Sequence, residues 1–236
     1  MWWTFFPIPF PYFDEYHTHK KPYVTVILLW VNFIVFVTTF VLTLLLKNFG
    51  FEDMFNNLGV IPADIMAGQN LYTFVTYLFV HTGILHFLGN MWFLYIFGDN
   101  VEHNMGKINF SLFFLISGIM AAVIYIYVVP GSYFVPLVGG SGAISGILGA
   151  YIMLFPENKL HVILGPTARF KMSAFWYIWI WFIMQGVFLF VYPTASTSFL
   201  AHIAGFSSGI MLAYIFGKHI KYKNYKYETP GYLDTI

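Results

Sequence analysis

The sequence predicts an all-α membrane protein whose chain crosses the bilayer six times. Of its 236 residues, 59% are hydrophobic, 22% are aromatic and only 9% are charged, whereas about a quarter of the residues of a soluble domain are charged. The apolar residues also gather into long uncharged stretches. A helix needs about 20 such residues to cross a hydrocarbon layer of about 30 Å, so these stretches predict a polytopic bundle of transmembrane helices.

Six stretches are candidates for spans. Five of them meet or approach the required length, and the fourth in chain order is shorter because Pro156 closes it. The apolar run 71–98 is too long for one straight span, and His, Gly and Asn lie near its middle, so we expect a loop that turns into a helix at Ile84. The six predicted spans are Tyr23–Leu46, Ile84–Gly98, Ile108–Val129, Gly142–Phe155, Ala174–Tyr192 and Leu200–Phe216.

The distribution of Lys and Arg predicts the orientation of these spans. Basic residues collect in cytoplasmic connections. Ten of the 11 fall in the N-terminal arm, the second and fourth loops and the C-terminal tail, which lie on one side of the membrane in this parse. The loops on the other side contain Lys47 alone. We therefore expect a multi-pass protein of the cell (plasma) membrane with both termini cytoplasmic. The expected parts are a cytoplasmic or interfacial arm (1–22), a six-helix domain (23–217) and a cytoplasmic tail (218–236). The arm lacks the basic start of a cleaved signal peptide.

Composition excludes several classes of function. A formal net charge of only +1 gives no basic field for nucleic acid. The chain has no Cys and no HExxH motif, and it places no pair of Asp residues inside a span, so zinc proteases and aspartyl intramembrane proteases are excluded. We expect no cofactor and no metal. The expected partners are the lipid bilayer and transmembrane protein substrates, and the oligomeric state is open.

Polar residues inside a membrane are costly and mark functional sites. Three clusters open the second, fourth and sixth spans: His81 with His86 and Asn90, then Ser141, then His202. These spans all run from outside to inside, so the topology places the three clusters at one depth near the outer face. That coincidence predicts a site.

Small residues explain how Ser141 and His202 could meet. GxxxG pairs at 142–146 and 205–209 provide small faces that let helix axes approach closely, so we expect the fourth and sixth spans to pack together. A Ser hydroxyl becomes nucleophilic when an imidazole takes its proton. The carboxylates lie outside the spans or at the cytoplasmic end of the second, which predicts a Ser-His dyad without a third, acidic member.

Structural interpretations of the same residues remain open. Ser141 could be only a small residue at the start of a Gly-rich helix, and His202 could be only a hydrogen-bond donor between helices. Asn90 could be only a packing residue that joins the second and fourth spans. The pairing of a Ser with a His at one depth favours catalysis. Other polar residues are expected to be structural: His81 in holding the first loop, Glu102 in tying down the second loop, and Gln185 and Ser145 in packing or interhelical hydrogen bonds.

Four elements occur in order along the chain, namely the HxxxN pair His86 and Asn90, GDNVE at 98–102, GxSG at 139–142 and AHxxGFxxG at 201–209. Together they resemble the rhomboid intramembrane serine proteases. The resemblance implies Ser141 as the nucleophile, His202 as the general base, and His86 and Asn90 as oxyanion-hole side chains together with the backbone N–H of Ser141. Some members have an aromatic residue one turn after the nucleophile, where this chain has Ser145.

These observations predict an intramembrane serine endopeptidase that cleaves transmembrane segments of membrane proteins near the outer face. The alternative is a catalytically silent rhomboid-like scaffold that binds membrane proteins, although such proteins lose the Ser or the His and this chain has both. A transporter or channel would carry charges at the midplane or broken helices in paired repeats, and the sequence shows neither.

Overall fold

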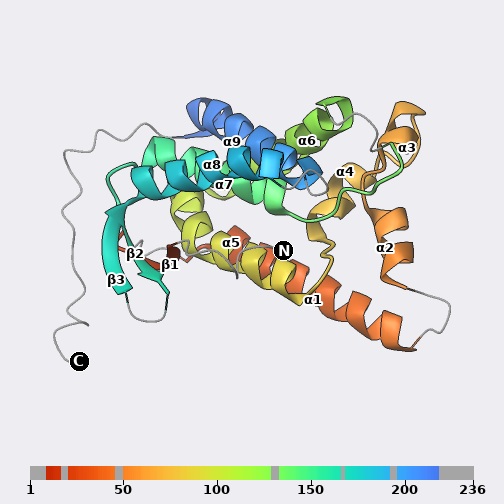
Figure 1. The fold of residues 1–236 in the computed structure, drawn as a ribbon, viewed down its shortest axis with the longest axis horizontal. Coiled ribbons are helices and arrows are strands. Elements are labelled where there is room, and N and C mark those ends of the chain that lie inside the picture. Colours follow the sequence, from red (N-terminus) through yellow and green to blue (C-terminus); the bar gives the residue numbers. More distant parts are fainter. Residues whose placement is uncertain are drawn as a thin grey trace.

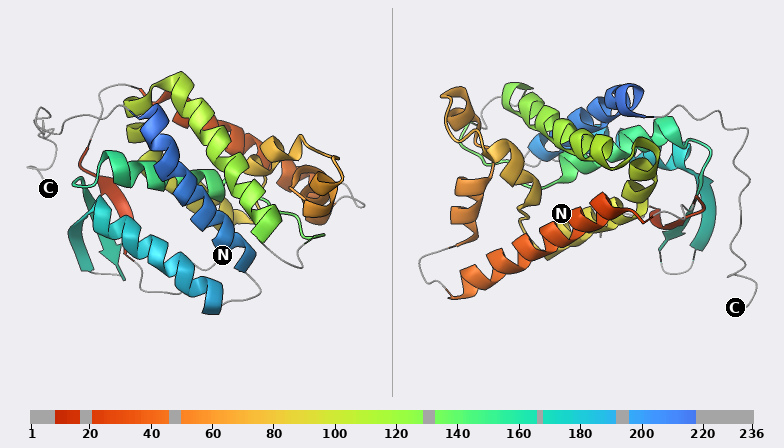
Figure 2. Two further views of the ribbon diagram at one scale, coloured as in Figure 1. Left: turned by 90° about the horizontal axis from the view of Figure 1, so that it is seen from above. Right: turned by 180° about the vertical axis from the view of Figure 1, so that it is seen from behind.

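A computed structural model describes residues 9–16, 21–45, 50–128, 133–165, 168–191 and 196–217 of this protein. The fold is mostly helical, with a small sheet at one end of the helices and the segment α2–α4 at the other (Figures 1 and 2). In chain order the elements are β1 (Phe10–Asp14), α1 (Tyr23–Leu45), α2 (Phe51–Leu58), α3 (Pro62–Met66), α4 (Thr73–Thr76), η1 (Tyr77–Phe79), α5 (Ile84–Met105), α6 (Lys107–Val128), α7 (Ser141–Leu154), β2 (Lys159–Leu164), β3 (Ala168–Ser173), α8 (Ala174–Val191) and α9 (Ser196–Phe216).

Each of the six predicted spans corresponds to a helix. Within the residues that the structure describes, four helices are long and apolar enough to cross a membrane, namely α1, α6, α8 and the part of α9 from Phe199, and α7 is a shorter apolar helix. Helix α5 continues seven residues beyond the predicted end at Gly98, to Met105, and carries the polar GDNVE run within its last turns. The first eight residues and the tail 218–236 lie outside the described residues.

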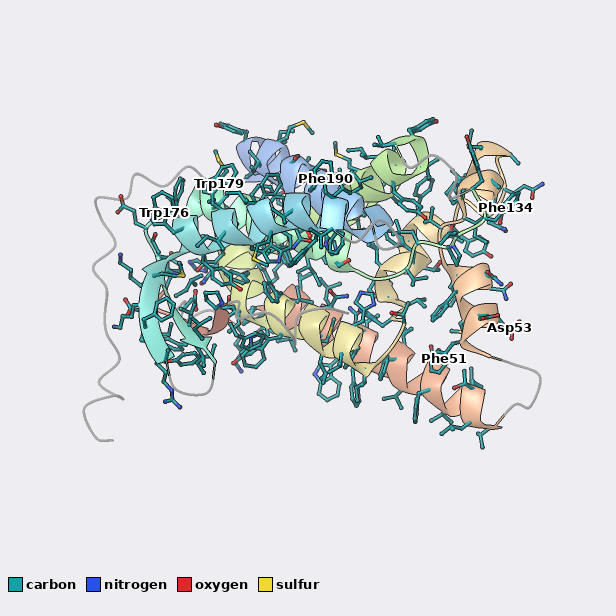
Figure 3. All side chains as sticks on the ribbon, viewed as in Figure 1. Phe51, Asp53, Phe134, Trp176, Trp179 and Phe190 are labelled. Atoms are coloured by element: carbon teal, nitrogen blue, oxygen red, sulfur yellow. The ribbon has the colours of Figure 1, made fainter. Side chains whose placement is uncertain are left out.

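Large apolar side chains cover the outside of these helices. On α8, Trp176 is 62% exposed and Phe190 is 82% exposed (Figure 3). On α1, Trp30 and Leu44 are exposed in the same way. Apolar exposure on this scale is unfavourable in water and suits hydrocarbon.

The expectation of an all-α chain is wrong in one respect, because the structure contains a three-stranded antiparallel sheet of order β1-β2-β3. Strand β1 pairs with β2 although almost 150 residues separate them, with Phe10 opposite Ile163 and Asp14 opposite Leu160. Pro11 lies in β1 where the register shifts. A residue without an N–H fits an edge strand at such an irregularity, but it weakens the strand signal in the sequence.

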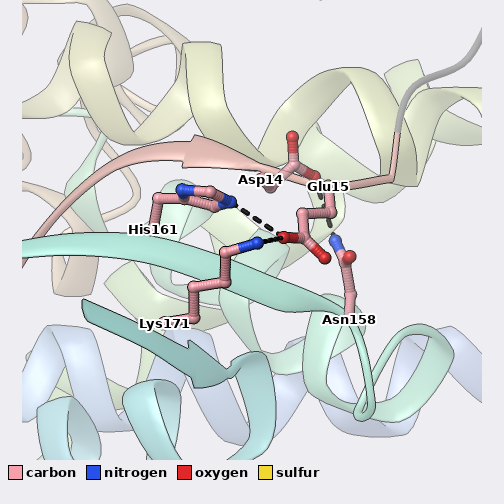
Figure 4. A network of polar contacts seen from close by, with 5 residues as sticks. All are labelled: Asp14, Glu15, Asn158, His161 and Lys171. Atoms are coloured by element: carbon pink, nitrogen blue, oxygen red, sulfur yellow. Dashed lines mark hydrogen bonds and ion pairs between the residues drawn. The ribbon is translucent and has the colours of Figure 1, made fainter. Parts of the chain in front are cut away.

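A buried carboxylate attaches β1 to the helices. Asp14 is only 5% exposed and accepts hydrogen bonds from Asn100 of α5, from the Tyr151 hydroxyl of α7 at 2.8 Å and from Asn158 at 3.1 Å; Figure 4 shows its contact with Asn158. Burial raises the pKa of Asp14 to about 6, and these hydrogen bonds offset only part of the increase. The network joins β1, α5 and α7.

The neighbouring carboxylate fixes the hairpin that leads into α8. Glu15 accepts from His161 of β2 at 2.9 Å and from Lys171 of β3 at 2.6 Å (Figure 4). These contacts hold the pKa of Glu15 below its usual value despite partial burial. Because α8 begins at Ala174, directly after β3, the sheet defines where this helix starts.

Glu102 contacts a different element from the one expected. It was expected to tie down the second loop, but its carboxylate accepts from the N–H groups of Val24 at 3.0 Å and Thr25 at 2.8 Å and from the Thr25 hydroxyl at 2.9 Å. These two N–H groups belong to the first turn of α1, where helix donors have no partner within the helix. Glu102 therefore joins the end of α5 to the start of α1.

The predicted packing of the fourth and sixth spans is confirmed by the contact between α7 and α9. A Cβ added at Gly205 would lie 2.0 Å from the Gly142 carbonyl oxygen, and one at Gly209 would lie 2.0 Å from the Gly146 carbonyl oxygen. The two backbones touch directly at these glycines. No side chain fits between them.

We expect Gly209→Ala to destabilise the protein because its new methyl group meets backbone atoms that cannot move aside. Overpacking costs about 1–3 kcal/mol, so the melting temperature in detergent should fall by several degrees. Gly186→Ala in α8 is the matched control, since a Cβ there meets no atom within 4 Å. Equal melting temperatures for the two variants would contradict the close contact.

Candidate active site

Ser141 is the first residue of α7, and the turn before it requires glycine. Gly139 has φ +111°, and its backbone passes so close to His86 that an added Cβ would lie 2.6 Å from the imidazole Cε1. A side chain is disfavoured at such a φ and would also collide with the ring. The Gly139 N–H donates to the Tyr77 carbonyl at 2.9 Å, which fixes the turn and hence the position of Ser141.

The structure brings Ser141 and His202 into hydrogen-bond contact. The Ser141 Oγ lies 2.9 Å from the His202 Nε2, and both residues are partly buried. Ser141 opens α7 and His202 lies in α9, one turn before Gly205, so the glycine contact of these helices sets the distance between the two side chains. The geometry allows the imidazole to accept the hydroxyl proton.

The second nitrogen of His202 contacts α8. Its Nδ1 lies 2.8 Å from the Gln185 Oε1. The rings of Trp181 and Phe199 lie beside the imidazole, with centroids 6.1 and 6.3 Å away. The sequence predicts packing or an interhelical hydrogen bond for Gln185, and in the structure its partner is His202. The available signal was that Gln185 is the sole amide or charged side chain between Ala174 and Val191.

Ser145 does not reach His202. Its hydroxyl donates to the Ser141 carbonyl, 2.6 Å away and one turn earlier in α7. The aromatic contacts of the imidazole come instead from Trp181 and Phe199.

Asn90 and His86 bring two side-chain nitrogens to the turn that precedes Ser141. Asn90 is 7% exposed, and within the described residues its Nδ2 has no hydrogen-bond partner. Both the His86 Nε2 and the Asn90 Nδ2 lie within 4 Å of the point where a Gly139 Cβ would be. The His86 Nδ1 lies 3.0 Å from the Thr82 Oγ1. A Thr82 hydroxyl that donates to Nδ1 leaves the proton of a neutral His86 on Nε2, so both groups can donate beside Ser141.

His81 lies behind His86. It is buried, its Nδ1 contacts the Phe79 carbonyl at 3.2 Å, and its ring packs edge-on against His86 and Phe87. These contacts agree with the predicted role in holding the first loop. They also restrict the orientation of the His86 ring.

The arrangement offers nucleophile and hydrogen-bond chemistry. In the part of the chain that the structure describes, no cluster of three or more His, Cys, Asp or Glu residues could hold a metal ion. What converges is a hydroxyl, an imidazole that hydrogen-bonds it and two further N–H donors. This set of groups is suited to acyl transfer.

Comparison with known proteins places the chain in a family. The Rhomboid domain matches residues 68–219, which include every residue of the site. The chain is 25% identical over 181 residues to rhomboid protease GlpG of Haemophilus influenzae, covering 75% of this chain and 86% of that protein. It is 27% identical over 187 residues to putative rhomboid protease YdcA of Bacillus subtilis, covering 76% and 87%.

A plant relative matches over a shorter region. The chain is 28% identical over 121 residues to RHOMBOID-like protein 6, mitochondrial, of Arabidopsis thaliana, which is 46% of this chain and 38% of the relative. The family match covers more than half of the chain, and both bacterial similarities extend over most of their partners. The chain therefore belongs to the rhomboid family of polytopic membrane proteins.

Proposed function

We propose that this protein is an intramembrane serine endopeptidase that uses Ser141 and His202 as its catalytic dyad. The observation that carries the proposal is the 2.9 Å hydrogen bond between the Ser141 Oγ and the His202 Nε2 at the start of α7. The two bacterial relatives, one named a rhomboid protease and the other a putative rhomboid protease, support the same activity.

In the first step, the His202 Nε2 takes the proton of the Ser141 hydroxyl while Oγ attacks the scissile carbonyl carbon. The carbonyl oxygen becomes an oxyanion, which the Ser141 N–H, the Asn90 Nδ2 and the His86 Nε2 stabilise. The positive end of the α7 dipole adds to this stabilisation. His202 then gives the proton to the leaving amine, and the acyl-enzyme forms. In the second half, His202 takes a proton from water, which attacks the acyl carbon, and then returns that proton to the Ser141 Oγ as it leaves.

The Asn90 amide supports its proposed role because its Nδ2 is buried without a hydrogen-bond partner in the described structure. Leaving a buried donor unpaired costs about 1–3 kcal/mol. An oxyanion that forms only in the transition state would satisfy this donor at the moment when charge develops. The cost in the resting enzyme then becomes a gain in rate.

The proposed substrates are transmembrane segments of other membrane proteins. We assign six spans to α1, α5, α6, α7, α8 and α9, with both termini cytoplasmic in the cell membrane, so that Ser141 lies near the outer face. A helical substrate has its carbonyls in hydrogen bonds and must unwind before attack, which favours segments with Gly, Pro or polar residues near that face. A silent scaffold would have no need for the Ser141–His202 contact.

We expect Ser141→Ala and His202→Ala each to abolish cleavage of a transmembrane test substrate by the purified protein. The double variant should be no worse than either single one, because members of one catalytic unit are not additive. Ser145→Ala is the matched control: its hydroxyl bonds within α7, so cleavage should persist. Cleavage by Ser141→Ala at the normal rate would support the scaffold interpretation.

The oxyanion role of Asn90 predicts a specific kinetic effect. Loss of one donor costs about 10²-fold in kcat, so Asn90→Ala should lower kcat by about that factor and leave KM nearly unchanged. A packing role would instead lower the melting temperature and raise KM as well. A stable Asn90→Ala enzyme with full kcat would eliminate the catalytic role.

The proposed orientation is tested with single cysteines, since the natural chain has none. Asn56 in α2 and Glu157 between α7 and β2 are both exposed. A cysteine at 56 should react with an impermeant thiol reagent added outside intact cells, and one at 157 should react after lysis only. The reverse pattern would overturn the orientation.

A further inference from the structure

We propose that Gln185 is a positioning residue that fixes the tautomer and ring orientation of His202. This inference rests on the proposed function of the dyad. It adds a neutral third member, supplied by α8, to a site for which the sequence predicts two.

The geometry holds the Gln185 amide in one orientation. Its Oε1 lies 2.8 Å from the His202 Nδ1, and its Nε2 lies 3.5 Å from the Trp181 carbonyl one turn earlier in α8. The amide nitrogen donates to that carbonyl, so the oxygen faces the imidazole. Gln185 is only 2% exposed, so its acceptor oxygen is shielded from bulk solvent.

The contact determines which nitrogen of His202 carries the proton. A neutral imidazole has one N–H, and an amide oxygen only accepts. The proton must therefore lie on Nδ1 for the bond to Gln185 to exist. The lone pair is then on Nε2, directed at the Ser141 hydroxyl, as a general base requires.

The amide also serves the charged intermediate. When Nε2 takes the Ser141 proton, the imidazolium keeps its Nδ1–H, which continues to donate to Oε1, and no proton passes to Gln185. Hydrogen bonds in which one partner is ionised are roughly twice as strong as neutral ones, so the contact strengthens as charge develops. A carboxylate would attract the imidazolium more strongly, but burying it beside apolar helices carries a large desolvation penalty.

Trp181 supports the same orientation. It lies four residues before Gln185 and therefore on the same face of α8. Its ring is tilted by 35° to the imidazole with centroids 6.1 Å apart. One face of α8 thus provides both the hydrogen-bond acceptor Gln185 and an aromatic ring that packs beside His202.

The kinetic test compares two variants of similar volume. Gln185→Met removes the acceptor, whereas Gln185→Glu keeps an acceptor oxygen in either protonation state. General base catalysis is worth about 10²–10⁴-fold, and we expect Gln185→Met to lose about 10- to 100-fold in kcat with KM unchanged. Gln185→Glu should recover most of this loss. Asn32→Leu removes an equally buried amide from α1, where Asn32 donates within its own helix, and is the control for the loss of a buried amide.

A spectroscopic measurement separates positioning from packing. In protein labelled with ¹⁵N-histidine, His202 of the wild type should show Nδ1 protonated, and Gln185→Met should shift it toward the other tautomer. The signal is assigned by its loss in His202→Ala. If Gln185→Met does not fold, the wild-type tautomer decides: protonation on Nε2 overturns the inference.

The two proposals fail in different ways. Normal kcat in Gln185→Met, in an enzyme whose cleavage requires Ser141, removes the positioning role and leaves the dyad. Equal losses of kcat and melting temperature in Gln185→Met and Gln185→Glu would show a packing role. Cleavage that survives Ser141→Ala would remove the proposed function itself.

Discussion

The site depends on the direct contact between the backbones of α7 and α9. Glycines on both helices leave no room for a Cβ at the crossing, and this brings Ser141 and His202 to hydrogen-bond distance. A wider separation of the helices would break that bond with every side chain unchanged. The start of α7 also lies against α5, where the Gly139 turn meets His86 and Asn90. Helix packing and the geometry of the proposed dyad are therefore one constraint.

The polar groups of the site differ from those of the sheet region in how far their hydrogen bonds are satisfied. Near Ser141 one buried donor is unsatisfied, because the Asn90 Nδ2 has no hydrogen-bond partner in the described structure. In the sheet region the two carboxylates are hydrogen-bonded: Asp14 accepts from three side chains, and Glu15 from two. The sheet fixes the start of α8, and α8 presents Gln185 to His202. The proposed catalysis requires both features: a sheet region that holds the helices in place and a donor near Ser141 that is free to bind the oxyanion.

Sequence reasoning succeeded where physical rules are local. Span length, hydropathy and GxxxG spacing predicted the helices and the pairing of α7 with α9, and polar residues at one depth predicted which side chains would meet. It failed where partners lie far apart in the chain. Strand β1 is short, contains Pro11 and pairs with a hairpin almost 150 residues away, and Glu102 contacts α1 rather than its own loop. The sequence predicts an interhelical or packing role for Gln185, but its partner His202 follows only from how α8 packs on α9.

The central claim is that the structure makes Ser141 a nucleophile by placing His202 beside it. The most direct measurement is mass spectrometry of the protein after reaction with a fluorophosphonate, which attacks activated serines. The account predicts a single adduct on Ser141 that is lost in His202→Ala, while Ser145 and the other serines stay unmodified. An adduct on another serine, or labelling of Ser141 at the same rate without His202, would contradict it.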